Sequence, residues 1–235
     1  MRTILHIGQH KTGTTSLQHY LQKQRNNLLK EGLYIPDSIM GIRHPSHYIL
    51  NVYSLESKRL SPMKEVLIKS KTPDYFYRLE ENLIADIERH YQQAKEQQCS
   101  EIIWTNEGLY LLNSVAEYKK LRQLFEQYSD EIICICCFRE KNSFRQSYMQ
   151  QLKKQGLPFS QEEDSYCHIE STSWLFDYDR KKDILQQVFS KNIYIPYNSE
   201  DMIQTFMAYI GYDSVATTKT ERLNITSYVQ TLSAN

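Results

Sequence analysis

The sequence predicts an α/β fold in three layers, with a mainly parallel β-sheet flanked by helices. Short apolar runs alternate along the chain with segments of helical periodicity. The runs are almost entirely apolar, which is typical of parallel strands that are buried on both faces. A turn rich in glycine and threonine joins the first run to the first helical segment. Because open α/β sheets bind ligands beyond the carboxyl ends of their strands, this turn is expected to lie at a ligand site.

The first strand is expected over residues 3–8, and the helix after it carries apolar residues from Leu17 to Leu29. Residues 34–73 contain four prolines, so we expect loops and short helices there. A long amphipathic helix is expected from Phe76 to Gln98, because its apolar residues recur at intervals of three, four and seven.

The second half of the chain continues the alternation of strands and helices. The expected elements are a strand at 101–105, a helix at 115–128, a strand at 131–138, helices at 142–155 and 178–189, a strand at 192–197 and a helix at 200–209.

Length and charge limit the classes of function. The 235 residues, 40% hydrophobic and 24% charged, suit a single domain over 1–235. The 28 basic and 28 acidic residues balance, so no overall field attracts nucleic acid. No apolar run reaches the roughly 18 residues that a membrane span needs. We therefore expect neither a nucleic-acid partner nor a membrane span.

The five cysteines are expected to be free and buried. Their number is odd and their spacing does not fit a metal site, and three of them lie in the apolar run at 131–138. Free thiols are typical of a reducing compartment, which predicts a cytoplasmic protein.

The stretch "HIGQHKTGTTS" resembles a phosphate-binding loop with its lysine displaced. Gly8 and Gly13 have the glycine spacing of a Walker A loop, but Thr14 stands where the lysine is expected and Lys11 lies inside the loop. Backbone N–H groups of such a loop, and of the helix that follows, can bind a phosphate. Lys11 would then reach the bridging oxygen of a leaving group, where negative charge develops during transfer.

Two further polar residues follow strands. Glu107 comes after the strand at 101–105, and Arg139 comes directly after the strand at 131–138. Both should meet the loop at one sheet edge. An acceptor hydroxyl there would have to lose a proton as it attacks, and the candidate bases are Glu107 and three histidines, His10, His44 and His47.

Two motifs resemble those of sulfotransferases that use 3′-phosphoadenosine 5′-phosphosulfate (PAPS). The segment "KTGTTS" at 11–16 is similar to the family's 5′-phosphosulfate-binding loop. In "FREKNSFRQS", Arg139 and Ser147 are eight residues apart, like the arginine and serine that bind the 3′-phosphate in that family. A looser similarity to bacterial and carbohydrate sulfotransferases covers residues 176–199.

The resemblance implies a P-loop NTPase-like sulfotransferase fold and a set of site residues. Glu107 corresponds to the base of the carbohydrate-modifying branch, and Arg222, in "TERLNITSY", to a second ligand of the 3′-phosphate. The residues implied at the 5′-phosphosulfate are Lys11, Thr12, Gly13, Thr14, Thr15 and Ser16. No metal is expected, since a sulfuryl group carries less charge than the phosphoryl group that metals neutralise in kinases.

The resemblance thus predicts transfer of a sulfuryl group from PAPS to a hydroxyl, releasing adenosine 3′,5′-bisphosphate. The acceptor is expected to be a small molecule or a carbohydrate, with a slight preference for a carbohydrate or glycolipid. One alternative is an ATP-dependent small-molecule kinase, which a magnesium requirement would distinguish. The other is a nucleotide-binding protein without turnover.

Overall fold

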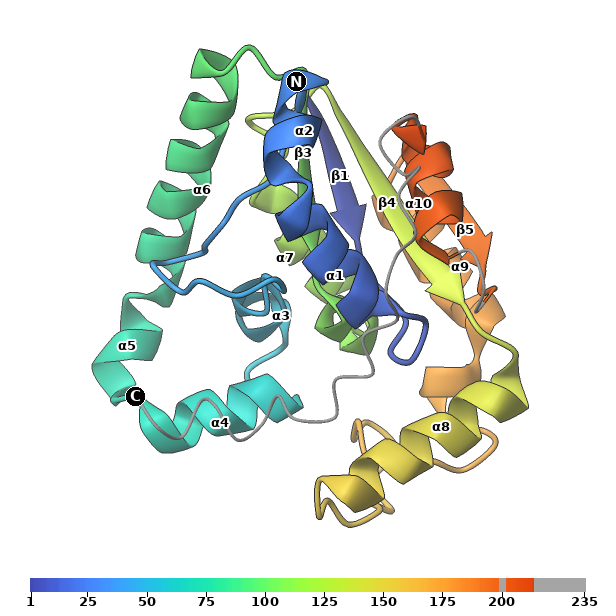
Figure 1. Ribbon diagram of the computed structural model, residues 1–235. Helices are drawn as coiled ribbons and strands as arrows, with labels where there is room; N and C mark the ends of the chain where they lie inside the picture. The colour runs from blue at the N-terminus through green and yellow to red at the C-terminus, as the bar shows by residue number, and fades with distance from the viewer. Residues whose placement is uncertain (199–201, 214–235) are drawn as a thin grey trace.

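The computed structural model describes residues 1–198 and 202–213, and within these ranges five parallel strands form one sheet (Figure 1). The strand order is β2-β3-β1-β4-β5. The strands are β1 (Arg2–His6), β2 (Leu33–Tyr34), β3 (Glu101–Thr105), β4 (Glu131–Phe138) and β5 (Lys191–Pro196). Each neighbouring pair is parallel, so the carboxyl ends of all these strands lie at one edge. The predicted α/β fold is confirmed.

Helices connect the strands and flank the sheet. In chain order they are α1 (Thr14–Lys23), α2 (Arg25–Lys30), α3 (Ile49–Ser54), α4 (Pro62–Ser70), α5 (Pro73–Tyr77), α6 (Leu79–Glu96), α7 (Val115–Gln123), α8 (Lys141–Lys154), α9 (Tyr178–Val188) and α10 (Met202–Ile210). Two short 3₁₀ helices, η1 (Glu107–Leu111) and η2 (Trp174–Phe176), complete the described elements.

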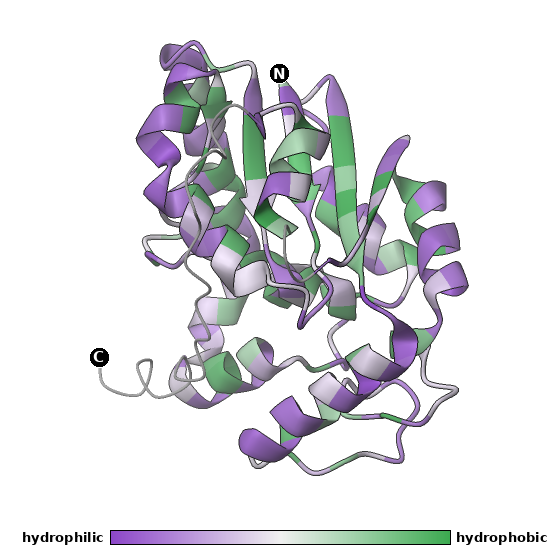
Figure 2. Ribbon diagram, turned by 45° about the vertical axis from the view of Figure 1, so that its right-hand side comes forward, coloured by the Kyte–Doolittle hydropathy of each residue, from purple (hydrophilic) through white to green (hydrophobic). Residues whose placement is uncertain are grey.

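The sheet lies between two helical layers. Side chains of α1, α2 and α10 form one core with one face of the sheet, and those of α6, α7 and α9 belong to the core on the other. Successive residues of β4 alternate between the cores, because neighbouring side chains of a strand point to opposite faces. Both cores are apolar, which explains why the strands are rich in apolar residues, while their ends carry hydrophilic ones (Figure 2).

The structure divides two predicted helical segments, contains one strand that was not predicted, and ends the helix expected at 115–128 at Gln123; several other elements begin or end one to two residues away from the prediction. The first helical segment divides at Gln24 into α1 and α2, and the segment from Phe76 divides at Arg78 into α5 and α6. Both dividing residues keep φ near −90° and ψ near 0°, so the apolar spacing continues across them without a visible break. Strand β2 is not predicted because it has only two residues, inside a segment expected to be irregular.

All five cysteines lie in the described part of the chain, and each is free and buried, as predicted. Burial raises the pKa of the Cys137 thiol to about 12. Across residues 1–198 and 202–213, none of the helices combines the length and the apolar character that crossing a membrane requires.

His47 attaches the segment 35–48 to the end of β3. Its ring Nδ1 accepts a hydrogen bond from the Thr105 N–H at 3.0 Å, and its Nε2 donates to the Pro36 carbonyl at 3.2 Å. The ring is fully buried, and this burial lowers its pKa to about 4. With both nitrogens engaged in a neutral ring, His47 has no nitrogen left for a substrate, so its role is structural.

The protein should lose stability in mild acid because of its buried histidines. Burial lowers the pKa of both His6 and His47 from 6.5 to about 4, so the unfolded chain takes up protons before the folded one. The free energy of unfolding therefore decreases as the pH falls from about 6.5 to about 4, by on the order of 3 kcal/mol for each histidine. Urea unfolding across that range should show a smaller loss for His47→Gln than for the wild type. If the wild type and His47→Gln lost the same unfolding free energy over this pH range, the buried, neutral state of His47 would be contradicted.

Candidate functional site

The candidate site lies at the carboxyl ends of the neighbouring strands β1 and β4. The chain segments that follow these two strands pack on opposite faces of the sheet. After β1 the chain enters α1, which packs in one core, while after β4 it enters α8, whose Phe144 and Tyr148 pack in the other. Beyond the carboxyl ends of such strands a parallel sheet forms a ligand-binding crevice. The loop 7–13 and Arg139 therefore flank this position, as the sequence predicted.

Gly8 brings the loop against the backbone of Glu107. The loop continues the pairing with β4, since the Cys137 N–H donates to the Gly8 carbonyl at 2.8 Å. Gly8 has a φ of +83°, and a Cβ there would lie 2.7 Å from the Cα of Glu107. Only glycine fits this approach without a shift of backbone, and it places Glu107 directly beside the loop.

Gln9 joins the loop to the end of β4. Its fully buried side chain accepts from the Arg139 N–H at 2.9 Å and donates to the Tyr178 hydroxyl at 3.0 Å. That hydroxyl donates in turn to the Arg139 carbonyl at 2.7 Å. The Thr12 hydroxyl donates to the Gln9 carbonyl at 2.6 Å, so it holds the loop together and is not free to donate to a ligand.

The N-terminus of α1 is open. Gly13 is its N-cap, with a φ of +74°, and no side chain among the described residues caps it. The first intrahelical bond runs from Leu17 N–H to the Gly13 carbonyl, so the N–H groups of Thr14, Thr15 and Ser16 precede it. Uncapped N–H groups together with the helix dipole favour an anion. Thr15 and Ser16 are partly exposed, whereas Thr14 is buried.

Arg139 connects the loop to α8. Its Nη1 donates to the Lys11 carbonyl at 3.1 Å and its Nε to the Ser143 hydroxyl at 2.8 Å. Ser147, the partner expected from the sequence, lies one turn further along the same face of α8 and is partly exposed. The N-terminus of α8 is capped by Glu140, unlike that of α1.

Lys11 lies in a positively charged part of the site. Its backbone has a φ of +65°, which is uncommon for a residue other than glycine and is found mostly at turns and functional sites. Burial lowers the pKa of its amine, and repulsion from Lys154 and Arg139 lowers it further. Among the described residues, no carboxylate forms an ion pair with Lys11 or Arg139. An anionic ligand would relieve this repulsion.

Glu107 lies on the other side of the loop, at the start of η1. Its Oε2 accepts from the Gln18 amide of α1 at 2.6 Å and from the Ser46 hydroxyl at 3.4 Å. The Glu107 charge also opposes the lowering of the His10 pKa that burial causes. The carboxylate therefore lies near the loop residue that precedes Lys11.

The remaining rival histidines have different surroundings. The His10 ring packs edge-on against Tyr148, at 5.7 Å between centroids, and its buried Nδ1 has no hydrogen-bond partner among the described residues. His44 Nδ1 accepts from the Ser46 N–H at 3.0 Å. Of the rival histidines, His10 is therefore the one whose pKa both Lys11 and Glu107 influence. Arg222 lies outside the described residues.

Several polar residues of the site were not singled out from the sequence: Gln9, Gln18, Ser46, Ser143 and Tyr178. Gln18 had a detectable signal, because it follows Thr14 by four residues and so shares its helix face. Ser143 had the same kind of signal, since it follows Arg139 by four residues. Gln9, Ser46 and Tyr178 contact the site through partners far away in the sequence, which no local pattern reveals.

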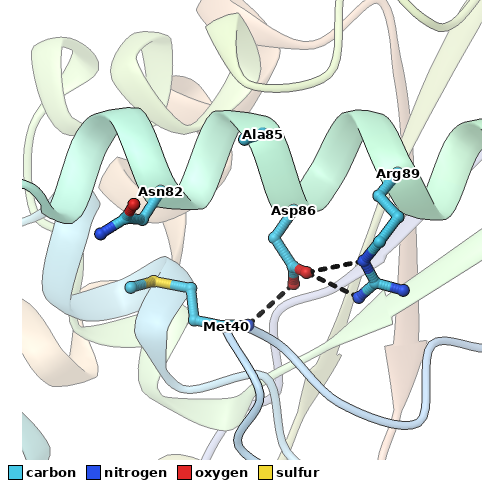
Figure 3. A pocket seen from close by; sticks show the side chains of 5 residues that line it. All are labelled: Met40, Asn82, Ala85, Asp86 and Arg89. Carbon is cyan, nitrogen blue, oxygen red and sulfur yellow. Dashed lines mark hydrogen bonds and ion pairs between the residues drawn. The ribbon is translucent and has the colours of Figure 1, made fainter.

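A hollow of about 400 Å³ lies elsewhere, between α6 and the turn at 39–42 (Figure 3). Asp86 accepts there from the Met40 N–H at 2.8 Å and from Arg89 at 2.6 Å. The Asp86 carboxylate is thus occupied in holding the turn against α6. Neither the loop nor Glu107 or Arg139 lines this hollow, so it is separate from the candidate site.

No family model matches the chain, and no curated protein matches it. Solved structures are similar over most of its length. A sulfotransferase from Alicyclobacillus acidocaldarius has 15% identity and a TM-score of 0.49, covering 90% of this chain and 81% of that one. The tunicamycin resistance protein of Deinococcus radiodurans has 11% identity and a TM-score of 0.43, covering 89% of this chain and 95% of that one.

The sulfotransferase domain from the curacin biosynthetic pathway has 14% identity and a TM-score of 0.44, covering 94% of this chain and 75% of that one. Two of these three structures are sulfotransferases by name. With TM-scores below 0.5, the similarities carry no argument about function, which has to come from the residues of the site.

The close approach at Gly8 can be tested with a matched pair of glycines. Gly41 also has a positive φ, +74°, but no atom lies within 4 Å of the position that its Cβ would take, so Gly41→Ala adds backbone strain alone. Gly8→Ala adds a clash with Glu107 to similar strain, and should destabilise the protein by at least about 1 kcal/mol more. Urea unfolding of both variants measures the difference. Equal losses would show that the loop does not press against Glu107.

Proposed function

We propose that this protein is a sulfotransferase that moves the sulfuryl group of PAPS to an acceptor hydroxyl. The observation that carries the proposal is a pair of groups beside Lys11 that favour anions. One is the open N-terminus of α1, and the other is the guanidinium of Arg139, which donates to the Lys11 carbonyl. PAPS carries a 5′-phosphosulfate and a separate 3′-phosphate, and so matches two linked anion sites.

The residues present fit this nucleotide. The N–H groups of Thr14, Thr15 and Ser16 would hold the 5′-phosphate, as helix N-termini do. Arg139 would bind the 3′-phosphate, with Ser143 or Ser147 as the hydroxyl donor from α8. The sequence motif adds Arg222 to this second site.

Lys11 and Glu107 would provide the chemistry around the transferred group, which the bound nucleotide supplies. Lys11 would stabilise the negative charge that develops on the bridging oxygen as the sulfur–oxygen bond breaks. Glu107 would accept the proton of the acceptor hydroxyl as its oxygen bonds to sulfur. The products are a sulfate ester and adenosine 3′,5′-bisphosphate, with the proton on Glu107.

We further propose a carbohydrate or glycolipid hydroxyl as the acceptor, following the resemblance of Glu107 to the base of the carbohydrate branch. The free, buried thiols favour a cytoplasmic location.

Nucleotide choice tests the two anion sites. Adenosine 3′,5′-bisphosphate should bind more tightly than AMP or ATP in calorimetry, because only it offers the 3′-phosphate to Arg139. Arg139→Ala should weaken bisphosphate binding by about ten- to a hundred-fold, the range of one charged hydrogen bond. Arg78→Ala, an exposed arginine paired with Asp74, is the control and should bind normally. Equal affinity for AMP and the bisphosphate, or magnesium-dependent preference for ATP, would refute the proposal.

Transfer from ³⁵S-labelled PAPS to a panel of mono- and oligosaccharides tests the two catalytic roles. Lys11→Ala should lower kcat by on the order of 10² to 10³ with bisphosphate affinity much less changed, since Lys11 acts on transition-state charge. Glu107→Gln should lower kcat by about 10² or more. Lys23→Ala, which removes an exposed lysine in the last turn of α1, serves as the control for Lys11 and should retain most turnover. A Lys11→Ala variant that fails only through lost nucleotide binding would contradict the role given to its amine.

A further inference from the structure

We propose that Gln18 is a positioning residue, which fixes the Glu107 carboxylate relative to the phosphate-binding end of α1. This inference rests on the proposed function. Gln18 lies outside the two motifs of the sequence and is only 3% exposed.

Gln18 lies one turn after the open N-terminus of α1. It follows Thr14 by four residues, so both project from the same face of the helix. Its amide Nε2 donates to Glu107 Oε2 at 2.6 Å, a contact between residues 89 positions apart in the chain. A helix turn is a rigid unit, so the anion site and Glu107 are held at a fixed separation through α1.

The contacts of Glu107 leave one oxygen for chemistry. Ser46 also donates to Oε2, at 3.4 Å, and the Ser46 oxygen itself accepts from the Asn106 amide at 3.1 Å. The Ser46 proton is therefore directed toward Glu107. Within the described residues, Oε1 of Glu107 accepts no hydrogen bond, which makes it the atom available for the acceptor's proton.

The position of this oxygen matters because transfer requires alignment of the acceptor, the sulfur and the leaving oxygen. A displacement of about 1 Å at a reacting centre can lower a rate by about 10². Without the Gln18 amide, the carboxylate would keep only the longer contact to Ser46. The base would then sample positions away from the attack line, while the N–H groups that bind the nucleotide stay in place.

The experiment compares Gln18→Leu with Gln22→Leu, which removes a glutamine one turn later whose amide donates to the Pro36 carbonyl at 2.9 Å. Gln18→Leu should lower kcat by about ten- to a hundred-fold while the KM for PAPS and the Kd for the bisphosphate change less than about twofold. Gln22→Leu should leave kcat near the wild-type value.

A double-mutant cycle separates positioning from a merely structural role. In the Glu107→Gln background, Gln18→Leu should lower kcat by less than about twofold, because the group that Gln18 positions no longer acts as a base. The same four proteins, compared by urea unfolding, give the contribution of the Gln18–Glu107 hydrogen bond to stability. Coupling in unfolding without coupling in kcat would make Gln18 a structural residue and overturn the inference, as would additive losses in kcat.

Different results would overturn the proposed sulfotransferase function and the proposed role of Gln18. If the wild type neither binds adenosine 3′,5′-bisphosphate nor transfers sulfate from PAPS, the proposed function falls, and the role of Gln18 falls with it. If the wild type does both but Gln18→Leu retains full kcat, only the inference about Gln18 is overturned.

Discussion

The arrangement of the site depends on the buried amide of Gln9. This one side chain bonds the loop after β1 to the backbone of Arg139 after β4, and to Tyr178 at the start of α9. A buried amide that lost these partners would leave unpaired polar groups in the protein interior, which is unfavourable by about 1–3 kcal/mol per group. The loop and Arg139 are thereby held together before any ligand binds. Because the loop is ordered in advance, ligand binding does not have to order the chain, and the site's charged groups can stabilise charge on the ligand.

Charge is distributed unevenly around this framework. Lys154 and Arg139 repel the Lys11 amine on one side of the loop. The carboxylate of Glu107 lies on the other side, held by the uncharged donors Gln18 and Ser46. Because Glu107 forms no ion pair with these cations in the described part of the chain, it leaves them available to an anion. In the proposed reaction, the cations would act on the donor phosphate and Glu107 on the acceptor hydroxyl.

The sequence could predict the sheet because strands buried on both faces are almost purely apolar, and the ranges 101–105 and 131–138 were predicted with the bounds that the structure has. The meeting of Glu107 and Arg139 with the loop followed from the rule for parallel strands. Contacts between distant side chains could not be predicted in this way. Ser143, rather than Ser147, bonds Arg139 in the described structure, since the choice depends on how the guanidinium turns toward the Lys11 carbonyl.

The central claim is that one nucleotide bridges the open end of α1 and Arg139. A crystal structure of the protein with adenosine 3′,5′-bisphosphate tests it most directly. The account predicts the 5′-phosphate on the N–H groups of Thr14, Thr15 and Ser16, and the 3′-phosphate on the guanidinium of Arg139, with the Glu107 carboxylate unbound to either phosphate. A bisphosphate bound elsewhere, or one whose 3′-phosphate lies in solvent away from Arg139, would contradict it.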